Sequence, residues 1–253
     1  MLRDQIGRLL PDNLKTAIYD TYRLTNRVRN RLTMRDGVVS LHGVRLRADP
    51  DLIGEEVVER ILVGDYEGRE ARMVSMFLEP SDRVIELGAG IGFIGLLCAS
   101  RLAPGQVQSF EANPMMEEII RGNYALNDGP LPELTIGLLS EEPGEAVFYI
   151  PELFWAASTT PIPDAKTVRT PRISLNEKIR ELGSTFLIMD IEGGEIDIIE
   201  ALEPGSVRKI AMELHPEVTG EDAIAGMTRR LTEMGFTRRW TSNAGQHAYF
   251  EAL

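Results

Sequence analysis

The chain has 253 residues and 39 acidic against 27 basic side chains, and the resulting net charge of -12 argues against nucleic acid as its main partner. Its single cysteine, Cys98, excludes an intrachain disulfide framework and is expected in the core. No stretch approaches the ~20 apolar residues that cross a bilayer, and no signal-peptide core is present, so we expect a cytoplasmic protein without a transmembrane segment.

Residues 1–35 differ in charge from the rest of the chain. Eight basic residues stand against three acidic ones there, a net charge of +5 that leaves -17 for the remainder. Five apolar residues at near-helical spacing predict an amphipathic helix: Leu14, Ile18, Tyr22, Val28 and Leu32. With a small hairpin at Val38–Arg47, this helix makes residues 1–50 an N-terminal extension. We expect it to pack on the acidic domain or on a second subunit, giving a homo-oligomer, or to contact a membrane surface.

The stretch Arg83–Ala99 organises residues 51–253, and helices over Asp51–Leu62 and Tyr66–Leu78 are expected to lead into it. It reads as a short apolar strand with Glu86 near its end, a glycine turn and a helix. Glycines let the chain turn sharply and bring bare amides against a ligand at a helix N-terminus. The pattern therefore indicates a site for a nucleotide-like cofactor, with these glycines in the turn: Gly88, Gly90 and Gly92.

Two kinds of cofactor site share this logic. Gly90–Gly95 satisfies G-x-G-x-x-G, and Glu111 lies about twenty residues downstream, as in nicotinamide dinucleotide sites. Glu86, however, would repel a pyrophosphate, whereas a carboxylate suits a ligand with an ammonium group and a sulfonium. Glu86–Gly92 resembles the E/D-x-G-x-G-x-G signature of class I S-adenosylmethionine-dependent methyltransferases, and we therefore favour the methyl donor.

The next strand, Val107–Phe110, ends at a second candidate group for the cofactor. Glu111 can accept hydrogen bonds from two ribose hydroxyls at this position. We expect it to bind the cofactor together with its two neighbours, Ala112 and Asn113.

An irregular segment follows a helix and two strands, which are expected over Met115–Leu126, Leu134–Leu138 and Ala146–Ile150. Pro151–Pro171 contains several prolines and is expected to be a loop over the acceptor site. Its aromatic pair, Phe154 and Trp155, either stacks on a substrate or pins the loop to the core.

The last third of the chain alternates strands and helices and closes with an antiparallel hairpin. The expected elements are strands at Thr185–Asp190 and Val207–Leu214, helices at Glu195–Leu202 and Gly220–Met234, and a hairpin of Phe236–Thr241 with His247–Glu251. This pattern predicts an α/β fold with a doubly wound, seven-stranded, Rossmann-like methyltransferase sheet.

Two further motifs narrow the resemblance. D-x-E-G-x-E at Asp190–Glu195 and E-x-H-P at Glu213–Pro216 are similar to motifs of the FkbM-type methyltransferases, although Ile188 and Gly90 depart from residues frequent in that family. The resemblance runs from about Glu55 to Pro216. It implies S-adenosylmethionine as cofactor and O-methylation of a small hydroxylated acceptor, such as a sugar or natural product.

The carboxyl ends of the parallel strands should gather the candidate catalytic residues. We predict that Asp190, Glu213 and His215 are catalytic and that Glu192 contacts the substrate. Methyl transfer to a hydroxyl requires positioning and removal of a proton, which a carboxylate or a histidine can accept. Alternatively, a divalent cation held by the carboxylates acidifies the hydroxyl.

Other polar residues leave alternatives open. Glu195 is either a helix N-terminal acid or a site residue, and polar residues of Gly64–Glu70 either reach the methionine end of the donor or form a solvated helix start. His42 and His247 are expected to be structural and distant from the site. Two alternative functions remain, a nicotinamide-dependent oxidoreductase and an S-adenosylmethionine-binding module without catalysis.

Overall fold

A computed structural model describes residues 11–150, 166–242 and 245–252, and contacts divide the chain into two compact units, 1–68 and 69–253. The domain boundary that the sequence places at residue 50 stays a prediction. Phe154 and Trp155 lie outside the described residues. Within the described ranges, no helix has the length and apolar character needed to cross a membrane.

The first unit contains the predicted amphipathic helix and hairpin. Its elements are α2 (Asp12–Thr33), β1 (Val38–Leu41), β2 (Val44–Arg47) and α3 (Pro50–Val63). α3 begins after Asp49, whose side chain accepts a hydrogen bond from the Asp51 amide, and ends at Gly64 in the left-handed conformation. Helix and hairpin are thus confirmed.

The side of α2 that packs within the first unit is polar. Asn26 donates a hydrogen bond to the Val63 carbonyl and Asn30 to the Leu62 carbonyl, so two buried amides satisfy the last turn of α3. The apolar side chains on the other side are exposed, with Ile18 at 52% and Leu32 at 80%. What covers them, and whether the helix forms an oligomer, stays a prediction.

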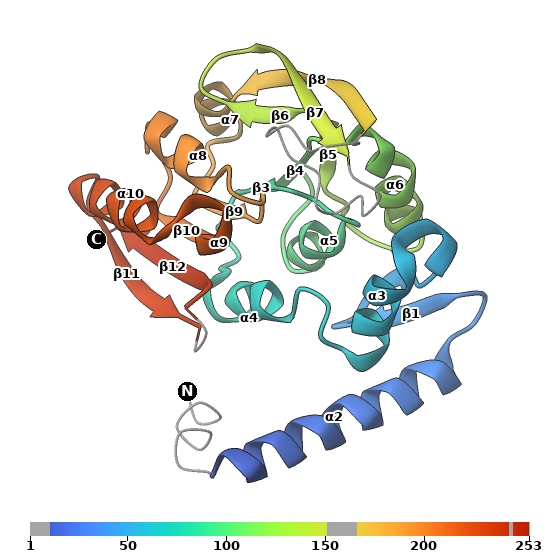
Figure 1. Cartoon of the computed structure of the whole chain (residues 1–253). Helices are drawn as coiled ribbons and strands as arrows, with labels where there is room; N and C mark the ends of the chain where they lie inside the picture. Colours follow the sequence, from blue (N-terminus) through green and yellow to red (C-terminus); the bar gives the residue numbers. More distant parts are fainter. Residues whose placement is uncertain (1–10, 151–165, 243–244, 253) are drawn as a thin grey trace. The chain divides into compact units, whose positions relative to one another are not determined.

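The second unit is built on a seven-stranded sheet in the order β11-β12-β10-β9-β3-β4-β5 (Figure 1). Its strands are β3 (Val84–Leu87), β4 (Val107–Glu111), β5 (Glu133–Ile136), β9 (Phe186–Met189), β10 (Lys209–Glu213), β11 (Phe236–Thr241) and β12 (His247–Ala252). Its helices are α4 (Gly68–Phe77), α5 (Phe93–Ala99), the 3₁₀ turn η1 (Pro114–Met116), α6 (Glu117–Ala125), α7 (Leu175–Leu182), α8 (Glu195–Ala201), α9 (Pro216–Thr219) and α10 (Glu221–Glu233).

The sheet confirms the predicted doubly wound, Rossmann-like fold class. Strands β5, β4, β3, β9 and β10 are parallel, and β12 pairs antiparallel to β10 and β11, which is the predicted closing hairpin. The strand order reverses between β3 and β9, because β4 lies on one side of β3 and β9 on the other. Ligands of such sheets bind beyond the carboxyl ends of the strands at this switch point.

Alternate residues of the central strands face different helices. Ile85 and Leu87 of β3 belong to the core packed against α7, α8 and α10. Glu86, between them, instead contacts the first turn of α5. Helices thus cover both faces, which explains the continuous apolar runs in the parallel strands.

A second sheet of three strands was only partly predicted. It contains β6 (Leu138–Ser140), β8 (Lys166–Ser174) and β7 (Gly144–Ile150), in the order β6-β8-β7. The prediction that Pro151–Pro171 is entirely a loop is wrong at its end, because β8 begins at Lys166 and includes Pro171. The sequence interpretation also missed α7, although Leu175, Ile179 and Leu182 have helical spacing and are buried.

Gly88 lets the two central strands end in contact. Asp190 donates a backbone hydrogen bond to Leu87 (3.1 Å), and a Cβ at Gly88 would lie 1.9 Å from the Asp190 carbonyl oxygen. Gly88 also has φ +83°, which other residues rarely adopt. A side chain here would separate the glycine turn from the end of β9.

We predict that Gly88→Ala destabilises the protein by about 2–3 kcal/mol more than Gly105→Ala, the scale of overpacking a core. Gly105 has a similar φ of +78° with nothing within 4 Å of a Cβ, so it controls for backbone strain alone. Urea denaturation of both variants measures the difference, and equal losses would contradict the close approach.

Candidate functional site

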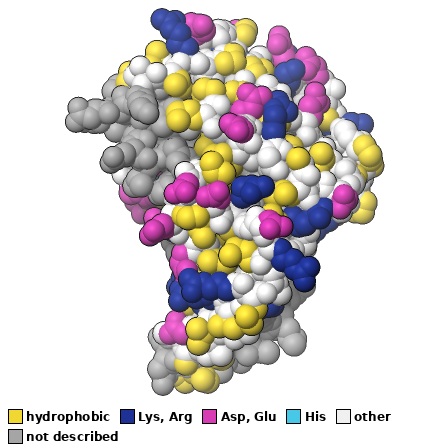
Figure 2. Space-filling model, turned by 90° about the vertical axis from the view of Figure 1, so that its right-hand side faces the viewer, with side chains coloured by type: hydrophobic (Ala, Val, Ile, Leu, Met, Phe, Trp, Pro, Cys, Tyr) yellow, Lys and Arg dark blue, Asp and Glu magenta, His cyan; other side chains and the backbone are white. Residues whose placement is uncertain are grey.

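The carboxyl ends of β3, β9 and β10 bring most of the predicted site residues together. The glycine turn follows β3, Asp190 follows β9 directly, and β10 ends at Glu213. Two further residues join them, His247 from β12 and Glu70 from α4. The sequence predicts that His247 lies away from the site, whereas for Gly64–Glu70 it leaves a role near the donor open. On the face drawn in Figure 2, charged side chains of both signs are interspersed with hydrophobic ones.

Glu86 is fully occupied by the protein. Its Oε1 accepts a hydrogen bond from the Gly95 amide (2.8 Å), its Oε2 accepts one from the Ser109 hydroxyl, and the residue is 2% exposed. Burial raises the pKa of Glu86 to about 8, despite these two hydrogen bonds. In this geometry Glu86 anchors the first turn of α5.

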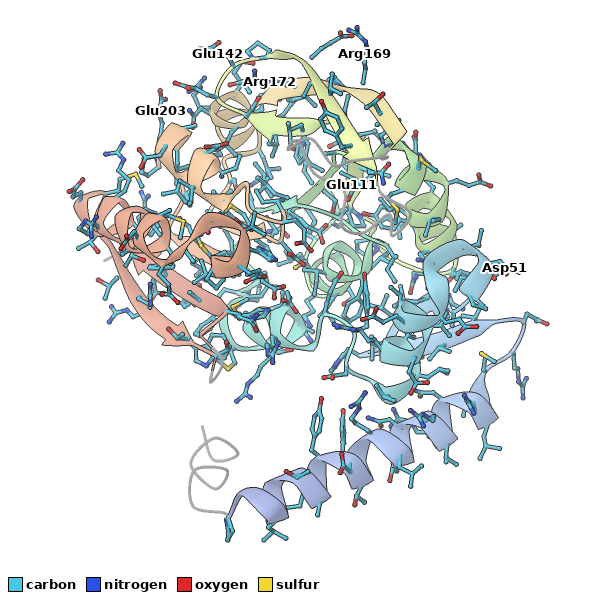
Figure 3. All side chains as sticks on the ribbon, viewed as in Figure 1. Asp51, Glu111, Glu142, Arg169, Arg172 and Glu203 are labelled. Carbon is cyan, nitrogen blue, oxygen red and sulfur yellow. The ribbon has the colours of Figure 1, made fainter. Side chains whose placement is uncertain are left out.

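Glu111 ends β4 and holds the glycine turn in the same way. Its carboxylate accepts hydrogen bonds from the Gly90 amide (3.0 Å) and the Asn113 amide (2.8 Å). Burial raises its pKa to about 6, and the amide donors oppose the shift. Figure 3 shows Glu111 deep among the strands, whereas Glu142, Arg169 and Glu203 lie at the periphery. Glu111 and Asn113, which were predicted to bind the cofactor, therefore lie next to the glycine turn.

Asn113 has one polar atom to spare beside Glu111. Its Oδ1 accepts a hydrogen bond from the Met115 amide, but its buried Nδ2 has no partner among the described residues. A buried donor without a partner is costly and points to an acceptor on a ligand or water. Ala112, between Glu111 and Asn113, is partly buried.

Two glycines of the turn are required by the protein itself. A Cβ at Gly92 would lie 2.7 Å from the Tyr124 ring, as one at Gly88 would strike the Asp190 carbonyl. We expected these glycines to leave room for a ligand. The contacts give a different reason for Gly88 and Gly92, because a side chain at either position would clash within the protein. Gly90 differs, because its amide is the one that Glu111 accepts from.

His215 stands at the centre of a group of carboxylates just after β10. Its Nδ1 lies 2.8 Å from Glu195 Oε1, and Glu195 also accepts from the Gly193 amide, so the imidazole is held by a side chain that is 3% exposed. Its Nε2 lies 3.7 Å from Asp190 Oδ1 and 3.6 Å from Glu192 Oε2, beyond hydrogen-bond distance. Glu195 thus contacts the predicted site residue His215 and is also an acid in the first turn of α8, so the two alternatives are compatible.

Asp190 and Glu192 occupy the turn between β9 and α8. The Oδ1 atom of Asp190 is buried and has no hydrogen-bond partner within the described part of the chain. Glu192 has φ +52°, a strained value for a residue other than glycine, and its side chain is 44% exposed. Both side chains reach His215 at the open side of the group.

His247 belongs to the same group, so the expectation that it lies far from the site is wrong. Strand pairing places His247 opposite Glu213, and their side chains approach to 3.5 Å. His247 Nε2 also makes a close hydrogen bond with Glu70 of α4, and both residues are buried. We call these seven residues the acid–histidine cluster: Glu70, Asp190, Glu192, Glu195, Glu213, His215 and His247.

The pKa values follow from crowding in a buried space. Burial and the nearby Glu213 and Glu70 raise the pKa of Asp190 well above its usual range. Burial would lower the pKa of His215, but the bond to Glu195 and the surrounding carboxylates raise it to about 9. The same balance raises the pKa of His247 to about 9. The acid–histidine cluster thus contains five carboxylates and two imidazoles, and the carboxylates raise the pKa of both imidazoles.

Comparison with known proteins finds solved structures with a similar fold but low sequence identity. No family model and no curated protein sequence matches the chain, so the FkbM resemblance is not confirmed. Its fold resembles Trm5b from Pyrococcus abyssi (12% identity, TM-score 0.49, 85% of this chain and 56% of that one). It also resembles magnesium protoporphyrin IX methyltransferase from Synechocystis PCC 6803 with bound SAM (17% identity, TM-score 0.47, 96% of both chains).

The raised pKa of Glu86 predicts a pH-dependent stability that Glu86→Gln removes. Between the unfolded value of 4.5 and about 8, the unfolded chain loses this proton while the folded protein keeps it, so stability falls as pH rises. Glutamine mimics the protonated acid and can keep both hydrogen bonds.

We therefore expect Glu86→Gln to gain stability relative to the parent protein by about 1–4 kcal/mol between pH 5 and pH 8. Urea denaturation at several pH values measures this, with the exposed Glu118→Gln as control. Parallel pH profiles of parent and Glu86→Gln would show that Glu86 is ionised in the folded protein.

Proposed function

We propose that this protein is an S-adenosylmethionine-dependent methyltransferase that O-methylates a small hydroxylated acceptor. The observation that carries the proposal is the contact of Gly88 with Asp190, because it joins a glycine turn to a cluster of proton acceptors at the switch point of the sheet. When bound, S-adenosylmethionine supplies an electrophilic methyl group. The chain supplies the binding groups and a place for the acceptor's proton.

The residues around the turn fit the donor's nucleoside. Glu111 is a carboxylate at the end of the second parallel strand, where ribose hydroxyls are bound in related sheets. The Nδ2 atom of Asn113, which has no hydrogen-bond partner among the described residues, offers a donor beside it. Glu86 has a positioning role in this proposal, since it fixes the Gly95 amide at the start of α5 and holds the turn in place.

The acid–histidine cluster supports the acceptor half of the reaction. Methyl transfer to oxygen releases one proton, and Asp190, Glu213 and His215 are the catalytic groups proposed to take it up. Because the pKa of His215 is raised to about 9, the imidazole accepts the proton only in its deprotonated form. Glu192 is proposed to contact the acceptor, because its side chain is the most exposed of the cluster members at the open side. The FkbM resemblance supports a sugar or natural product as acceptor.

Two alternative functions remain distinguishable by simple binding measurements. A nicotinamide enzyme would be stabilised by NAD(H), whereas the proposed enzyme is stabilised by S-adenosylhomocysteine in a thermal-shift assay. A binding module without catalysis would bind S-adenosylhomocysteine but transfer no labelled methyl group to any acceptor.

For donor binding, we predict that Glu111→Gln weakens the affinity for S-adenosylhomocysteine by about 10-fold or more, the scale of a lost charge-assisted hydrogen bond. Glutamine keeps the size of the side chain and one acceptor for the turn amides. Calorimetry measures the dissociation constant, and Glu118→Gln is the matched, exposed control. Equal affinity of both variants would remove Glu111 from the donor site.

For catalysis, Asp190→Asn should lower methyl transfer about 100-fold or more, because it keeps the size but removes the charge of a proposed proton acceptor. Affinity for S-adenosylhomocysteine should change little. Labelled methyl transfer measures turnover, with the exposed Glu217→Gln as control. Full activity of Asp190→Asn would make the aspartate structural.

A further inference from the structure

Two histidine–carboxylate triads share Glu213. They differ because a direct hydrogen bond joins the histidine to a carboxylate in one triad but not in the other. In each triad, Asp190–Glu213–His215 and Glu70–Glu213–His247, one ligand atom from every residue lies within 4.8 Å of the others. We propose that the first triad binds a divalent metal ion of the kind that accepts one imidazole and two carboxylates, such as Mn²⁺.

The atoms of this triad converge without bonding to one another. In the part of the chain that the structure describes, the buried Asp190 Oδ1 has no hydrogen-bond partner, and it faces His215 Nε2 at 3.7 Å. Around an ion with bonds of about 2.1 Å, neighbouring ligand atoms lie about 3 Å apart and opposite ones about 4.2 Å. The spacing is therefore too long for hydrogen bonds but within small adjustment of a shared ion.

His215 is held in the orientation that a metal ligand needs. Its side chain is 6% exposed, and Glu195 fixes Nδ1 at 2.8 Å, which leaves Nε2 directed at the carboxylates. A carboxylate behind a histidine is the usual outer support of a metal-bound imidazole, since it fixes the ring and raises its basicity. Glu195 is a positioning residue in this arrangement.

The second triad is closed by comparison. Glu70 already bonds His247 Nε2 directly, and the side chains of these residues are 7% and 2% exposed. An ion in the second triad would have to break the buried bond between Glu70 and His247, whereas an ion in the first triad would break no such bond. We therefore assign Glu70 and His247 to an ion pair that supports Glu213, 3.5 Å from His247.

Charge favours a cation at the open triad. The cluster contains five carboxylates and two imidazoles, so the acidic groups outnumber the basic ones. A divalent ion bound to Asp190, Glu213 and neutral His215 cancels both ligand carboxylates. Imidazole together with carboxylates suits Mn²⁺ or Fe²⁺ better than Mg²⁺, which prefers oxygen ligands and water.

Metal binding itself does not depend on the proposed function; only its use does. If the chain is a methyltransferase, a bound ion offers coordination positions to a hydroxyl oxygen and lowers the pKa of that hydroxyl. The test is therefore made without donor or acceptor, so that its failure leaves the methyltransferase proposal intact. Calorimetry with S-adenosylhomocysteine tests that proposal separately.

The experiment titrates EDTA-treated full-length protein with Mn²⁺ and follows free Mn²⁺ by electron paramagnetic resonance. We expect one site per chain, with affinity lowered at least 10-fold in Asp190→Asn and in His215→Gln. The exposed Glu217→Gln should stay within about 2-fold of the parent, and Glu70→Gln, which removes a partner of the pair that supports Glu213, should lower the affinity less than Asp190→Asn does. Thermal unfolding of the metal-free proteins shows which variants are folded.

Imidazole nitrogen coupling in the bound Mn²⁺ spectrum provides a readout that survives a poorly folded aspartate variant. This coupling should be present in the parent protein and in His247→Gln, and absent in His215→Gln. Loss of binding in Glu70→Gln with retention in Asp190→Asn would overturn the assignment in favour of the other triad. No binding by the parent protein at millimolar Mn²⁺ would overturn the site altogether.

Discussion

The parallel pairing of β3 with β9 is the constraint on which the site depends. The register aligns Leu87 with Met189, so the residues that follow, Gly88 and Asp190, leave the sheet side by side. Their backbones approach so closely that no Cβ fits between them. The glycine turn and the acids after β9 therefore cannot move independently, and a change in one strand end shifts both halves of the site.

Buried carboxylates are stabilised here in three different ways. Glu86 lies below the glycine turn and is stabilised by keeping a proton between two hydrogen-bond donors. Glu195 and Glu70 are each stabilised by an imidazole. Asp190 Oδ1 has no hydrogen bond within the described ranges, and its nearest basic group, His215 Nε2, lies 3.7 Å away. Since ionised groups are costly to bury, a proton or a cation bound at Asp190 Oδ1 would stabilise the folded protein.

The sequence predicted the elements whose signals are local. Apolar runs bounded by turn residues identified β3, β9 and β10, and the terminal hairpin followed from two alternating segments around a glycine. β8 was missed because a proline such as Pro171 argues against a strand. In the structure Pro171 nevertheless lies in β8, opposite Glu145 of β7, in the small sheet outside the main one. α7 (Leu175–Leu182) was missed although it begins after the predicted irregular segment and its own apolar spacing is helical.

The site was predictable where strand ends carry motifs, but not where distant elements meet. Asp190, Glu213 and His215 follow from the rule that parallel strands share a carboxyl edge. His247 stands at the beginning of an antiparallel strand, and only the register of that strand with β10 places it opposite Glu213. A hairpin that pairs back onto the last parallel strand necessarily brings its own first residue to the carboxyl end of that strand. The polar residue at the start of β12 could therefore have been assigned to the site once the terminal hairpin was recognised. For Gly64–Glu70 the sequence left a role near the donor and a solvated helix start equally open, because only the packing of α4 decides which of these residues faces the site.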